Sequence, residues 1–176
     1  MKLCMFSIIL LLLQNIFAGE VSIFGETLLY EVPSQAIWNK PLINYDDDRS
    51  VGSIVYTHNP IMDSEGRSVS PVMAIIYEKL SSDSMDLIIY STIVRMRQGV
   101  SFEIDSISTA EDMGMNYHNS IYYDGYYYRD NIKHEVIVVH MVKGNIGIQI
   151  ICDSTDEVYS QVFLDMQKFV QSIKFK

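Results

Sequence analysis

The last third of the chain has the clearest pattern of apolar and polar positions. Two apolar stretches, residues 132–142 and 146–153, flank the dipeptide Gly144-Asn145, which is typical of a two-residue type II′ β-hairpin. Such a turn fixes the register of the two strands. Both faces of the predicted hairpin are largely apolar, whereas an antiparallel sheet with one wet face would alternate apolar and polar residues. We therefore expect a sheet that is covered on both sides.

A helix is predicted directly after this hairpin. Ser154-Thr155-Asp156-Glu157 has the spacing of a capping box, in which a serine and a glutamate bond each other's backbone N–H groups. The apolar residues that follow recur every three or four positions, which places them on one stripe of a helix. They are Val158, Tyr159, Val162, Phe163, Met166, Phe169, Val170 and Ile173. We expect this C-terminal amphipathic helix to cover one face of the sheet.

Five segments upstream have the alternation, or the β-branched and aromatic content, of strands. They are residues 26–32, 53–57, 72–77, 102–107 and 120–128. Within the last of these, either Gly125 marks a β-bulge or Asp124-Gly125 turns a hairpin. Residues 62–70 are polar and predict a loop.

Residues 85–96 fit two kinds of element. Their isoleucines favour a strand, but the segment is long and follows the cluster Ser81-Ser82-Asp83-Ser84, which could cap a helix. We expect a helix. If the segment were a strand instead, the sheet would gain a member and one of its faces would lose a cover.

The first eighteen residues have the pattern of a secretory signal peptide. Lys2 precedes an apolar run at 3–17, and the small residues Ala18 and Gly19 follow it. A membrane-spanning helix needs about 20 apolar residues, so this shorter run argues against an uncleaved anchor. We expect cleavage after Ala18, or one residue later after Gly19. The remainder, residues 19–176, is then a single exported domain with no stable membrane anchor.

Composition and charge exclude several classes of protein. A chain of 176 residues suggests one domain. The net charge of −9 argues against binding to nucleic acid or to anionic lipid. Cys152 is the one cysteine left after removal of the signal peptide, so no internal disulfide can form. Because the chain also lacks an N-glycosylation sequon, we expect a bacterial protein of the periplasm or the extracellular medium.

Four features, in this order, resemble the PsbP-like superfamily. They are Tyr30-Glu31-Val32-Pro33 with Trp38 close behind, the strand Tyr123-Asp124-Gly125-Tyr126, the hairpin Lys143-Gly144-Asn145, and the helix end Phe169-Val170-Gln171-Ser172-Ile173-Lys174-Phe175. That superfamily includes photosystem II extrinsic proteins, a Ran-binding nuclear import factor and many exported bacterial proteins. The resemblance covers roughly residues 26–175. It implies an α+β fold in which helices cover both faces of an antiparallel sheet, an α/β/α sandwich.

The residue types needed for catalysis or metal binding are present, but not in recognisable motifs. His134 and His140 share a strand face about 20 Å apart, too far for one metal ion to bridge, and His58 and His118 are isolated in sequence. The hairpin register places Cys152 on an apolar face, where a buried thiol is inert. The chain has no nucleophile elbow, phosphate loop or dinucleotide fingerprint. We therefore expect no catalytic residue, no metal site and no cofactor.

Tyrosines crowd one predicted strand and form the candidate binding site. Tyr122, Tyr126 and Tyr128 would face one way and Tyr123 and Tyr127 the other, if no bulge intervenes. One set can pack in the core, as aromatic residues of strands commonly do. The other set would be partly exposed, and exposed tyrosines are typical of protein interfaces and of surfaces that stack against carbohydrate.

The leading hypothesis is an exported, non-enzymatic binding or assembly protein that engages a protein or another macromolecule. PsbP-like proteins are mostly of this kind, so the resemblance implies the same character. One alternative is a small secreted hydrolase or metal-dependent enzyme whose site forms only in three dimensions. A deep pocket joining His58 or His118 to carboxylates would favour it, and scattered histidines on a shallow surface would count against it. A secreted effector that acts on a host cell is a further alternative.

Overall fold

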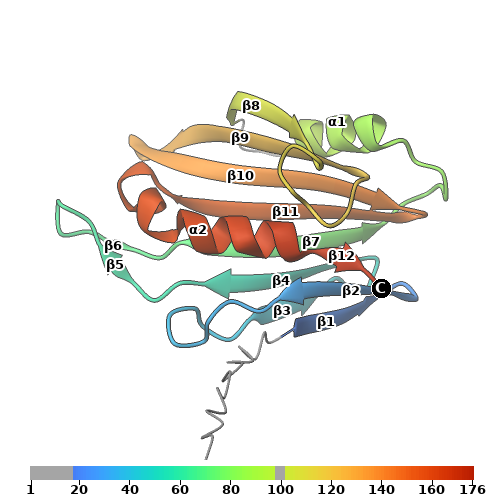
Figure 1. The fold of residues 1–176 in the computed structure, drawn as a ribbon, viewed down its shortest axis with the longest axis horizontal. Helices are drawn as coiled ribbons and strands as arrows, with labels where there is room; N and C mark the ends of the chain where they lie inside the picture. The colour runs from blue at the N-terminus through green and yellow to red at the C-terminus, as the bar shows by residue number, and fades with distance from the viewer. Residues whose placement is uncertain (1–17, 98–101) are drawn as a thin grey trace, which may run out of the picture.

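An antiparallel sheet of seven strands forms the centre of the structure (Figure 1). The computed structural model describes residues 18–97 and 102–176. The strands of this sheet are β3 (Leu42–Tyr45), β4 (Val51–Thr57), β7 (Val72–Lys79), β8 (Glu103–Thr109), β9 (Ser120–Arg129), β10 (Ile132–Lys143) and β11 (Ile146–Thr155). Their order across the sheet is β3-β4-β7-β11-β10-β9-β8, so β3 and β8 are the two edges. The predicted signal peptide lies outside the described residues, except for Ala18.

Smaller sheets and two helices complete the fold. A three-stranded sheet is formed by β1 (Ala18–Ile23), β2 (Glu26–Glu31) and β12 (Lys174–Phe175). A two-stranded sheet is formed by β5 (Ile61–Met62) and β6 (Ser68–Val69). The two helices are α1 (Leu87–Arg97) and α2 (Asp156–Ser172). The strands expected at 26–32, 53–57, 72–77, 102–107 and 120–128 are all present, with small shifts at their ends. The sequence pattern does not indicate β1, β3 or β12, and the loop expected at 62–70 contains part of the short β5–β6 pair.

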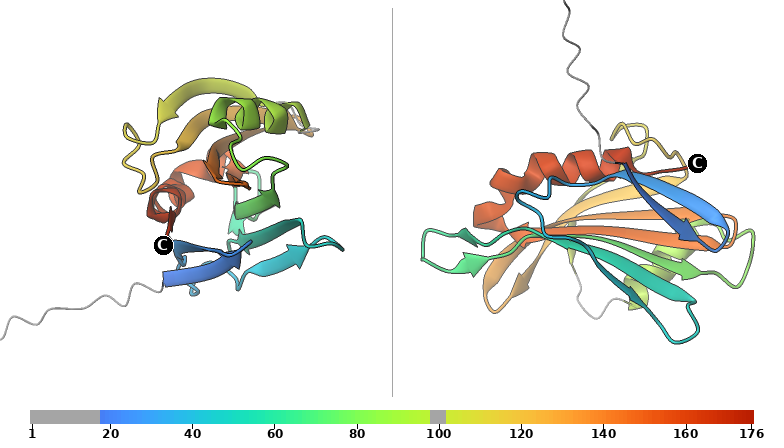
Figure 2. Two further views of the ribbon diagram at one scale, coloured as in Figure 1. Left: turned by 90° about the vertical axis from the view of Figure 1, so that its right-hand side faces the viewer. Right: turned by 90° about the horizontal axis from the view of Figure 1, so that it is seen from below.

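The α2 helix covers one face of the main sheet, as its apolar stripe predicts. Phe169 is buried in the same core as Val139 and Ile150, whose side chains point to this face from β10 and β11. The three-stranded sheet closes the same core beside the helix (Figure 2). The rings of Tyr30 and Tyr56 meet the Phe169 ring edge to face, with centroids 5.8 and 5.9 Å away, a favourable geometry for aromatic pairs. Burial of this stripe holds α2 in place.

The opposite face is covered by α1, but only in part. Tyr90, Ser91 and Val94 are the buried residues of α1, and the helix packs on β9 and β10 near His140 and Val142. Figure 2 shows α1 and α2 on different sides of the sheet. Toward β4 and β7 this second face remains half-exposed. The α+β class and the antiparallel sheet agree with the sequence prediction, whereas full cover by helices on both faces is not confirmed, because an eleven-residue helix is too short to span seven strands.

The β10–β11 hairpin has the predicted register. Cys152 lies opposite Ile137, and both side chains are buried. Gly144 has a φ of +57° at the first turn position, as a type II′ turn requires. The preceding β9–β10 connection turns at Asp130 and Asn131, whose φ values of +54° and +62° are those of a type I′ turn. Asp124-Gly125 therefore does not turn a hairpin.

Gly125 instead lies within β9, next to a register shift in β8 between Ile104 and Ser106. A Cβ atom at Gly125 would come within 2.0 Å of the backbone oxygen of Glu103. The glycine thus allows the irregular stretch of β8 to approach β9 closely. The bulge that the sequence suggested is present, but its extra residue belongs to the neighbouring strand.

Both helices begin differently from the sequence prediction. For α2 the N-cap residue is Thr155 without a side-chain cap bond, because β11 continues through Ser154 and leaves that serine in a strand. The predicted capping box is therefore wrong, and Glu157 accepts a bond from the Ser64 amide instead. The helix expected at 85–96 is present as α1. Its first turn is capped by Asp86, whose carboxylate accepts the amides of Ile88 and Ile89 at 2.8 and 3.1 Å.

Trp38 joins the loop after β2 to α2. Its side chain is fully buried, and its indole Nε1 donates to the Asp165 carboxylate of α2 over 3.1 Å. The His58 ring meets the indole edge to face, 4.9 Å between centroids. A buried indole N–H needs such an acceptor, so this bond positions the loop against the helix.

Gly147 determines how closely α1 can approach the sheet. A Cβ atom at this position would lie 2.4 Å from the Tyr90 ring. We predict that Gly147→Ala lowers the free energy of unfolding by about 1–3 kcal/mol, the usual cost of overpacking. Urea denaturation measures it. In a double-mutant cycle, Tyr90→Ala should remove most of the added cost, since it removes the ring that clashes. An equal cost in both backgrounds would show that Tyr90 is not the obstacle.

Candidate functional site

The five candidate tyrosines occupy different environments along β9. Tyr122 is 1% exposed in the core under α2, and Tyr123 is 4% exposed under α1, where its hydroxyl bonds Ser91. These two tyrosines stabilise the fold and offer no surface to a partner. Tyr126, Tyr127 and Tyr128 lie beyond the cover of the two helices and are partly or largely exposed. A binding surface on β9 is thereby limited to the last three tyrosines.

Tyr126 and Tyr128 point to the face that carries α2, at the end of the strand. The Tyr126 hydroxyl donates to the Glu103 carboxylate over 2.6 Å, and the Lys133 ammonium lies 4.6 Å from its ring centroid. Tyr128 is 63% exposed, with its ring edge to face against that of Tyr126. Arg129 follows Tyr128 and makes no ion pair within residues 18–97 and 102–176. An exposed tyrosine and an unpaired arginine are thus adjacent at this corner.

On the other face of the sheet Tyr127 belongs to a hydrogen-bonded cluster with His134 and Asp153. One Asp153 oxygen accepts the Tyr127 hydroxyl at 2.5 Å, and the other lies 2.8 Å from His134 Nδ1. The Tyr127 and His134 rings stack 4.8 Å apart. Burial, together with the bond to Asp153, raises the pKa of Tyr127 above its ordinary value, so the hydroxyl stays protonated and donates. Because a carboxylate only accepts, His134 Nδ1 also acts as a donor, and in the neutral imidazole Nε2 is then the acceptor.

This cluster borders a hollow of about 400 Å³ that we call the strand-end cleft. Its lining is mostly polar, and its charged or ionisable residues are Arg67, Arg129, Asp130, His134 and Asp153. Arg67 is already engaged, since its Nε lies 2.6 Å from Asp63 and its Nη1 lies 2.9 Å from Glu65. Arg129 is therefore the cation in the lining that remains available to a ligand.

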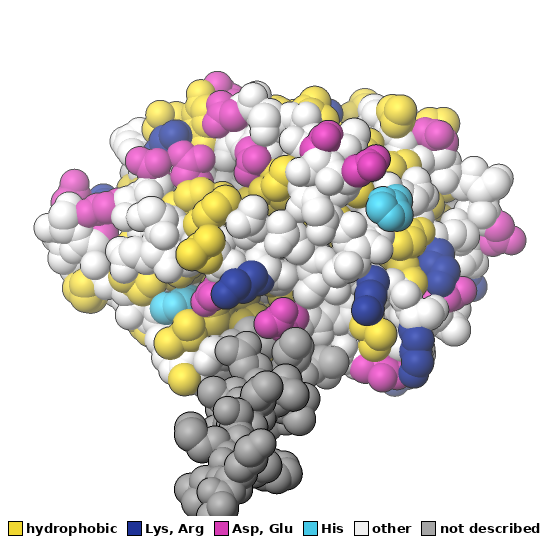
Figure 3. Space-filling view, in the orientation of Figure 1, with side chains coloured by type: hydrophobic (Ala, Val, Ile, Leu, Met, Phe, Trp, Pro, Cys, Tyr) yellow, Lys and Arg dark blue, Asp and Glu magenta, His cyan; other side chains and the backbone are white. Residues whose placement is uncertain are grey.

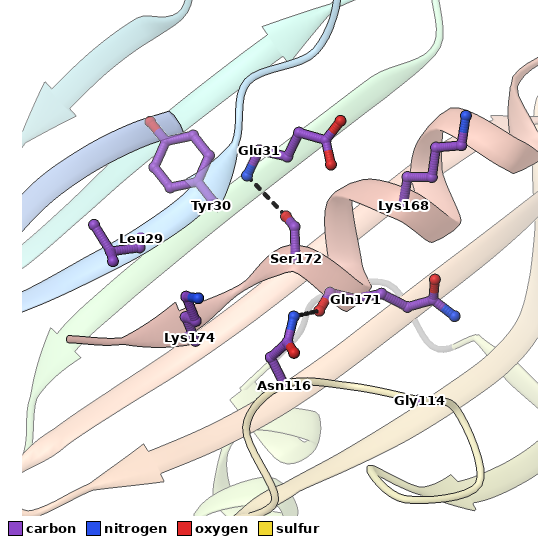
Figure 4. Close-up of a pocket in the computed structure, with 9 residues that line it drawn as sticks. All are labelled: Leu29, Tyr30, Glu31, Gly114, Asn116, Lys168, Gln171, Ser172 and Lys174. Carbon is purple, nitrogen blue, oxygen red and sulfur yellow. Dashed lines mark hydrogen bonds between the residues drawn. The ribbon is translucent and has the colours of Figure 1, made fainter. Parts of the chain in front are cut away.

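A second hollow, of about 540 Å³, lies at the other end of α2 (Figure 4). We call it the C-terminal groove. Most of its polar groups join elements of the fold to each other. Ser172 Oγ accepts the Glu31 amide at 2.8 Å, and the Asn116 side-chain amide donates to the Gln171 carbonyl at 2.7 Å. Lys168 and Lys174 line it without an ion pair to any described residue.

The surface around α2 carries both signs of charge. On the face seen in Figure 3, acidic side chains gather toward the upper edge and several basic ones toward the lower right. The two lysines of the C-terminal groove flank the last turn of a helix, where the helix dipole favours cations. Their placement therefore has a structural explanation. We consider the strand-end cleft the stronger candidate, because its hydrogen-bonded cluster is held in place and still reaches solvent.

A buried serine–histidine pair lies under α1 and is not a catalytic site. Ser91 Oγ is 2.7 Å from His140 Nδ1 and 2.6 Å from the Tyr123 hydroxyl. A nucleophilic serine needs such a neighbour, but Ser91 is 2% exposed and His140 is fully buried. No substrate can reach this pair while α1 is in place.

The remaining histidines and the cysteine are also accounted for by local structure. His58 packs on Trp38, and His118 is exposed; neither lines the strand-end cleft or the C-terminal groove. Cys152 is fully buried, and burial raises the pKa of its thiol, so it remains an unreactive thiol. Within the part of the chain that the structure describes, no three His, Cys, Asp or Glu residues are arranged to hold a metal ion.

Sequence reasoning overlooked the contact between His134 and Asp153. The structure extends the predicted hairpin register by two residues, so that His134 lies opposite Thr155, with Asp153 two positions along the same face. Diagonal neighbours of this kind are within reach of long side chains. The β9–β10 register, which puts Tyr127 opposite His134, was the missing information.

No protein-family model and no curated protein sequence matches this chain. Solved structures do match over most of its length, among them the three that follow. LpqN, involved in cell envelope biogenesis of Mycobacterium tuberculosis, is 16% identical with a TM-score of 0.55, and the match covers 91% of this chain and 92% of LpqN. PA94 from Pseudomonas aeruginosa, of unknown function, is 12% identical with a TM-score of 0.50, covering 88% and 94%.

The third match is the solution structure of cyanobacterial PsbP (CyanoP) from Synechocystis sp. PCC 6803, 13% identical over 90% of this chain and 92% of CyanoP. The chain shares its overall fold with LpqN and PA94. The CyanoP comparison has a TM-score of 0.49, so the argument for a shared architecture rests on LpqN and PA94. Identities this low show a shared fold and no activity.

His140 makes the stability of this domain depend on pH. Burial, with a smaller effect of Arg95, lowers the pKa of His140 from 6.5 to about 4. Between about pH 6.5 and pH 4, His140 therefore binds a proton in the unfolded chain but not in the folded chain. The contribution of neutral His140 to the free energy of unfolding is complete above pH 6.5 and is lost as the pH falls toward 4. The loss amounts to about 3 kcal/mol.

Chemical denaturation at successive pH values between 7 and 4.5 measures this loss. We expect His140→Gln to flatten the pH dependence in that window, because it removes the titrating group. His118→Gln is the matched control, since His118 is exposed, and it should keep the wild-type slope. An unchanged slope in His140→Gln would assign the pH dependence to other groups.

Proposed function

We propose that this protein is an exported, non-enzymatic binding or assembly protein that engages a macromolecule of the cell envelope. The observation that carries the proposal is the Tyr127–His134–Asp153 cluster at the edge of the strand-end cleft. Its groups are linked to each other, so they are held in one arrangement before a partner arrives. A preordered surface loses less conformational freedom on binding than a mobile one.

The residue types at this corner of the molecule support contact with a macromolecule. Arg129 lines the strand-end cleft, and Tyr128 is exposed on the opposite face of the same strand end. Tyrosine and arginine are enriched among the residues that dominate interface energies. Tyr126 is fixed beside them by Glu103 and Lys133. We propose the end of β9 as the contact region, with Tyr126 and Tyr128 on one face of the sheet and Tyr127 and Arg129 on the other.

An enzyme is the second candidate function, favoured by the His134–Asp153 contact alone. A histidine held by a carboxylate at Nδ1 has Nε2 free to accept a proton, as a general base does. The hydroxyl bonded nearby, Tyr127, donates to Asp153 and is a poor nucleophile because its pKa is raised. The histidines whose convergence would have favoured a hydrolase, His58 and His118, lie outside both hollows. These features support binding over catalysis.

A binding experiment tests the proposed surface. Tyr128→Ala and Arg129→Ala should each reduce recovery of the bound envelope component about tenfold or more, if they act as central contacts worth 2 kcal/mol or above. The measurement is quantitative mass spectrometry after affinity capture from envelope extract on residues 19–176. Leu164→Ala is the matched control, since Leu164 is 65% exposed, close to the 63% of Tyr128, and lies on α2.

Circular dichroism and thermal unfolding show whether each variant remains folded. Tyr123→Ala is unsuitable for this purpose, because Tyr123 is buried and its loss would disturb the packing of α1. Undiminished capture by folded Tyr128→Ala and Arg129→Ala variants would place the binding surface elsewhere.

Export by a cleaved signal peptide is part of the proposal. The involvement of LpqN in cell envelope biogenesis supports it. Among the described residues, no helix is long and apolar enough to cross a membrane. Gly19 belongs to β1, where it lies opposite Tyr30 with space for the ring only because it lacks a side chain. Cleavage after Ala18 preserves this pair, and cleavage after Gly19 removes it.

We therefore predict that the exported protein begins at Gly19. Intact-mass measurement and N-terminal sequencing of the protein from envelope and medium fractions test this prediction. Ala18→Arg should leave the full-length precursor, because the cleavage site requires a small residue. A first residue at Glu20 or beyond, or an uncleaved chain in the wild type, would contradict it.

A further inference from the structure

The edge strand β3 exposes all four of its residues. Leu42, Ile43 and Tyr45 are between 49% and 62% exposed although they are large and apolar. Strand β3 pairs only with β4, and its other side has no strand partner among the described residues. An apolar edge of this kind is a template for another strand.

The unpaired backbone groups of β3 can be located from its ladder with β4. The Asp46 amide donates to the Val51 carbonyl, so Asp46 faces β4. Backbone groups of an antiparallel strand alternate between its two sides. The N–H and C=O groups of Ile43 and Tyr45 therefore point away from the sheet, together with the carbonyl of Pro41.

The opposite edge of the sheet is protected in the usual ways. Strand β8 has a register shift between Ile104 and Ser106, and it carries the acidic residues Glu103 and Asp105. Bulges and charges of this kind hinder pairing with a further strand. Strand β3 has neither a bulge nor a charged residue between Leu42 and Tyr45. The two edges of the same sheet thus differ in their readiness to pair.

Opposite charges lie at the two ends of β3. Lys40 precedes the strand and makes no ion pair within the described residues, and the turn Asp46-Asp47-Asp48 follows it. Asp46 and Asp48 hold that turn by accepting bonds from Ser50 and the backbone. The side chain of Asp47 is exposed and has no such bond. An antiparallel copy of the same strand would bring each Lys40 to the acidic turn of the other chain.

We propose that a second copy of this chain pairs with β3 across a twofold axis and continues the antiparallel sheet. With Ile43 opposite its counterpart, the two Ile43 residues exchange hydrogen bonds, and each Tyr45 N–H donates to the Pro41 carbonyl of the other chain. This register also packs each Tyr45 against a Pro41 and places each Lys40 beside Asp46 and Asp47 of the other copy. Arg49, which lies 5.9 Å from the Tyr45 ring, stays on its own chain's side of the turn.

A second copy fits this edge better than an unrelated strand does. A twofold axis repeats every contact, so one Lys40–Asp47 attraction becomes two without any further residue. The strand is short, and it therefore buries a small interface of the weak, reversible class. The proposed contact does not involve the strand-end cleft, and it can exist whether or not the proposed binding function is correct.

Sedimentation velocity of residues 19–176 tests the pairing across roughly 1 μM to 1 mM, where small interfaces dissociate. We expect a reversible monomer–dimer equilibrium. Ile43→Lys should abolish it, because it places a charge at the axis of the interface. Asp47→Lys alone and Lys40→Asp alone should each raise the dimer dissociation constant roughly five- to tenfold, because an exposed ion pair contributes modestly but occurs twice.

The double variant Lys40→Asp with Asp47→Lys should restore the wild-type constant, since it exchanges the two charges. Glu111→Lys is the matched control: it changes the net charge as Asp47→Lys does, but lies in the exposed loop that follows β8, the other edge strand of the sheet. Asp47 is the appropriate acidic position, because Asp46 and Asp48 are needed to hold the turn.

Hydrogen exchange gives a second readout that locates the contact. The amides of Ile43 and Tyr45 should exchange rapidly at low protein concentration and become protected at high concentration. A monomer at every concentration would overturn the proposal. So would a dimer that persists in Ile43→Lys, or one that forms without protection of the Ile43 and Tyr45 amides, because either result places the interface elsewhere.

Discussion

The cross-strand register of β10 against β11 decides which side chains reach each face of the sheet. Ile137, Val139 and Met141 enter the core under α2, whereas His140 and Val142 face α1. Because side chains alternate along a strand, a slip of one residue would exchange the two sets and bury His140 among the aliphatic residues under α2. Both helices, and the cluster around His134, depend on this one alignment.

The sequence predicts this part of the fold well because the signals are local. The Gly144-Asn145 turn and the apolar spacing of α2 each lie within a few residues, so they can be recognised without tertiary contacts. Strands β1, β3 and β12 are short or irregular, and neighbours distant in sequence decide whether they form. The failed capping box has the same origin, because β11 extends by pairing and takes Ser154 into the sheet.

For the candidate site, the sequence predicts which face of the sheet each tyrosine points to, but not how deeply each one is buried. The alternation of the tyrosines along β9 follows from their spacing, because the register shift lies in β8 and leaves β9 regular. Their burial does not follow from this spacing. Tyr122 and Tyr123 are buried because α2 and α1 cover them, whereas Tyr128 is exposed because neither helix covers it. The contact between His134 and Asp153 needs the registers of three strands at once.

The position of Trp38 gives the molecule a built-in optical reporter. It is the only tryptophan in the sequence, and its fully buried indole is bonded to α2 through Asp165. Any event that lifts α2 from the sheet must break that bond and bring water to the indole, which shifts tryptophan fluorescence to longer wavelength. The docking of one helix can thus be followed by light emission from the unlabelled chain.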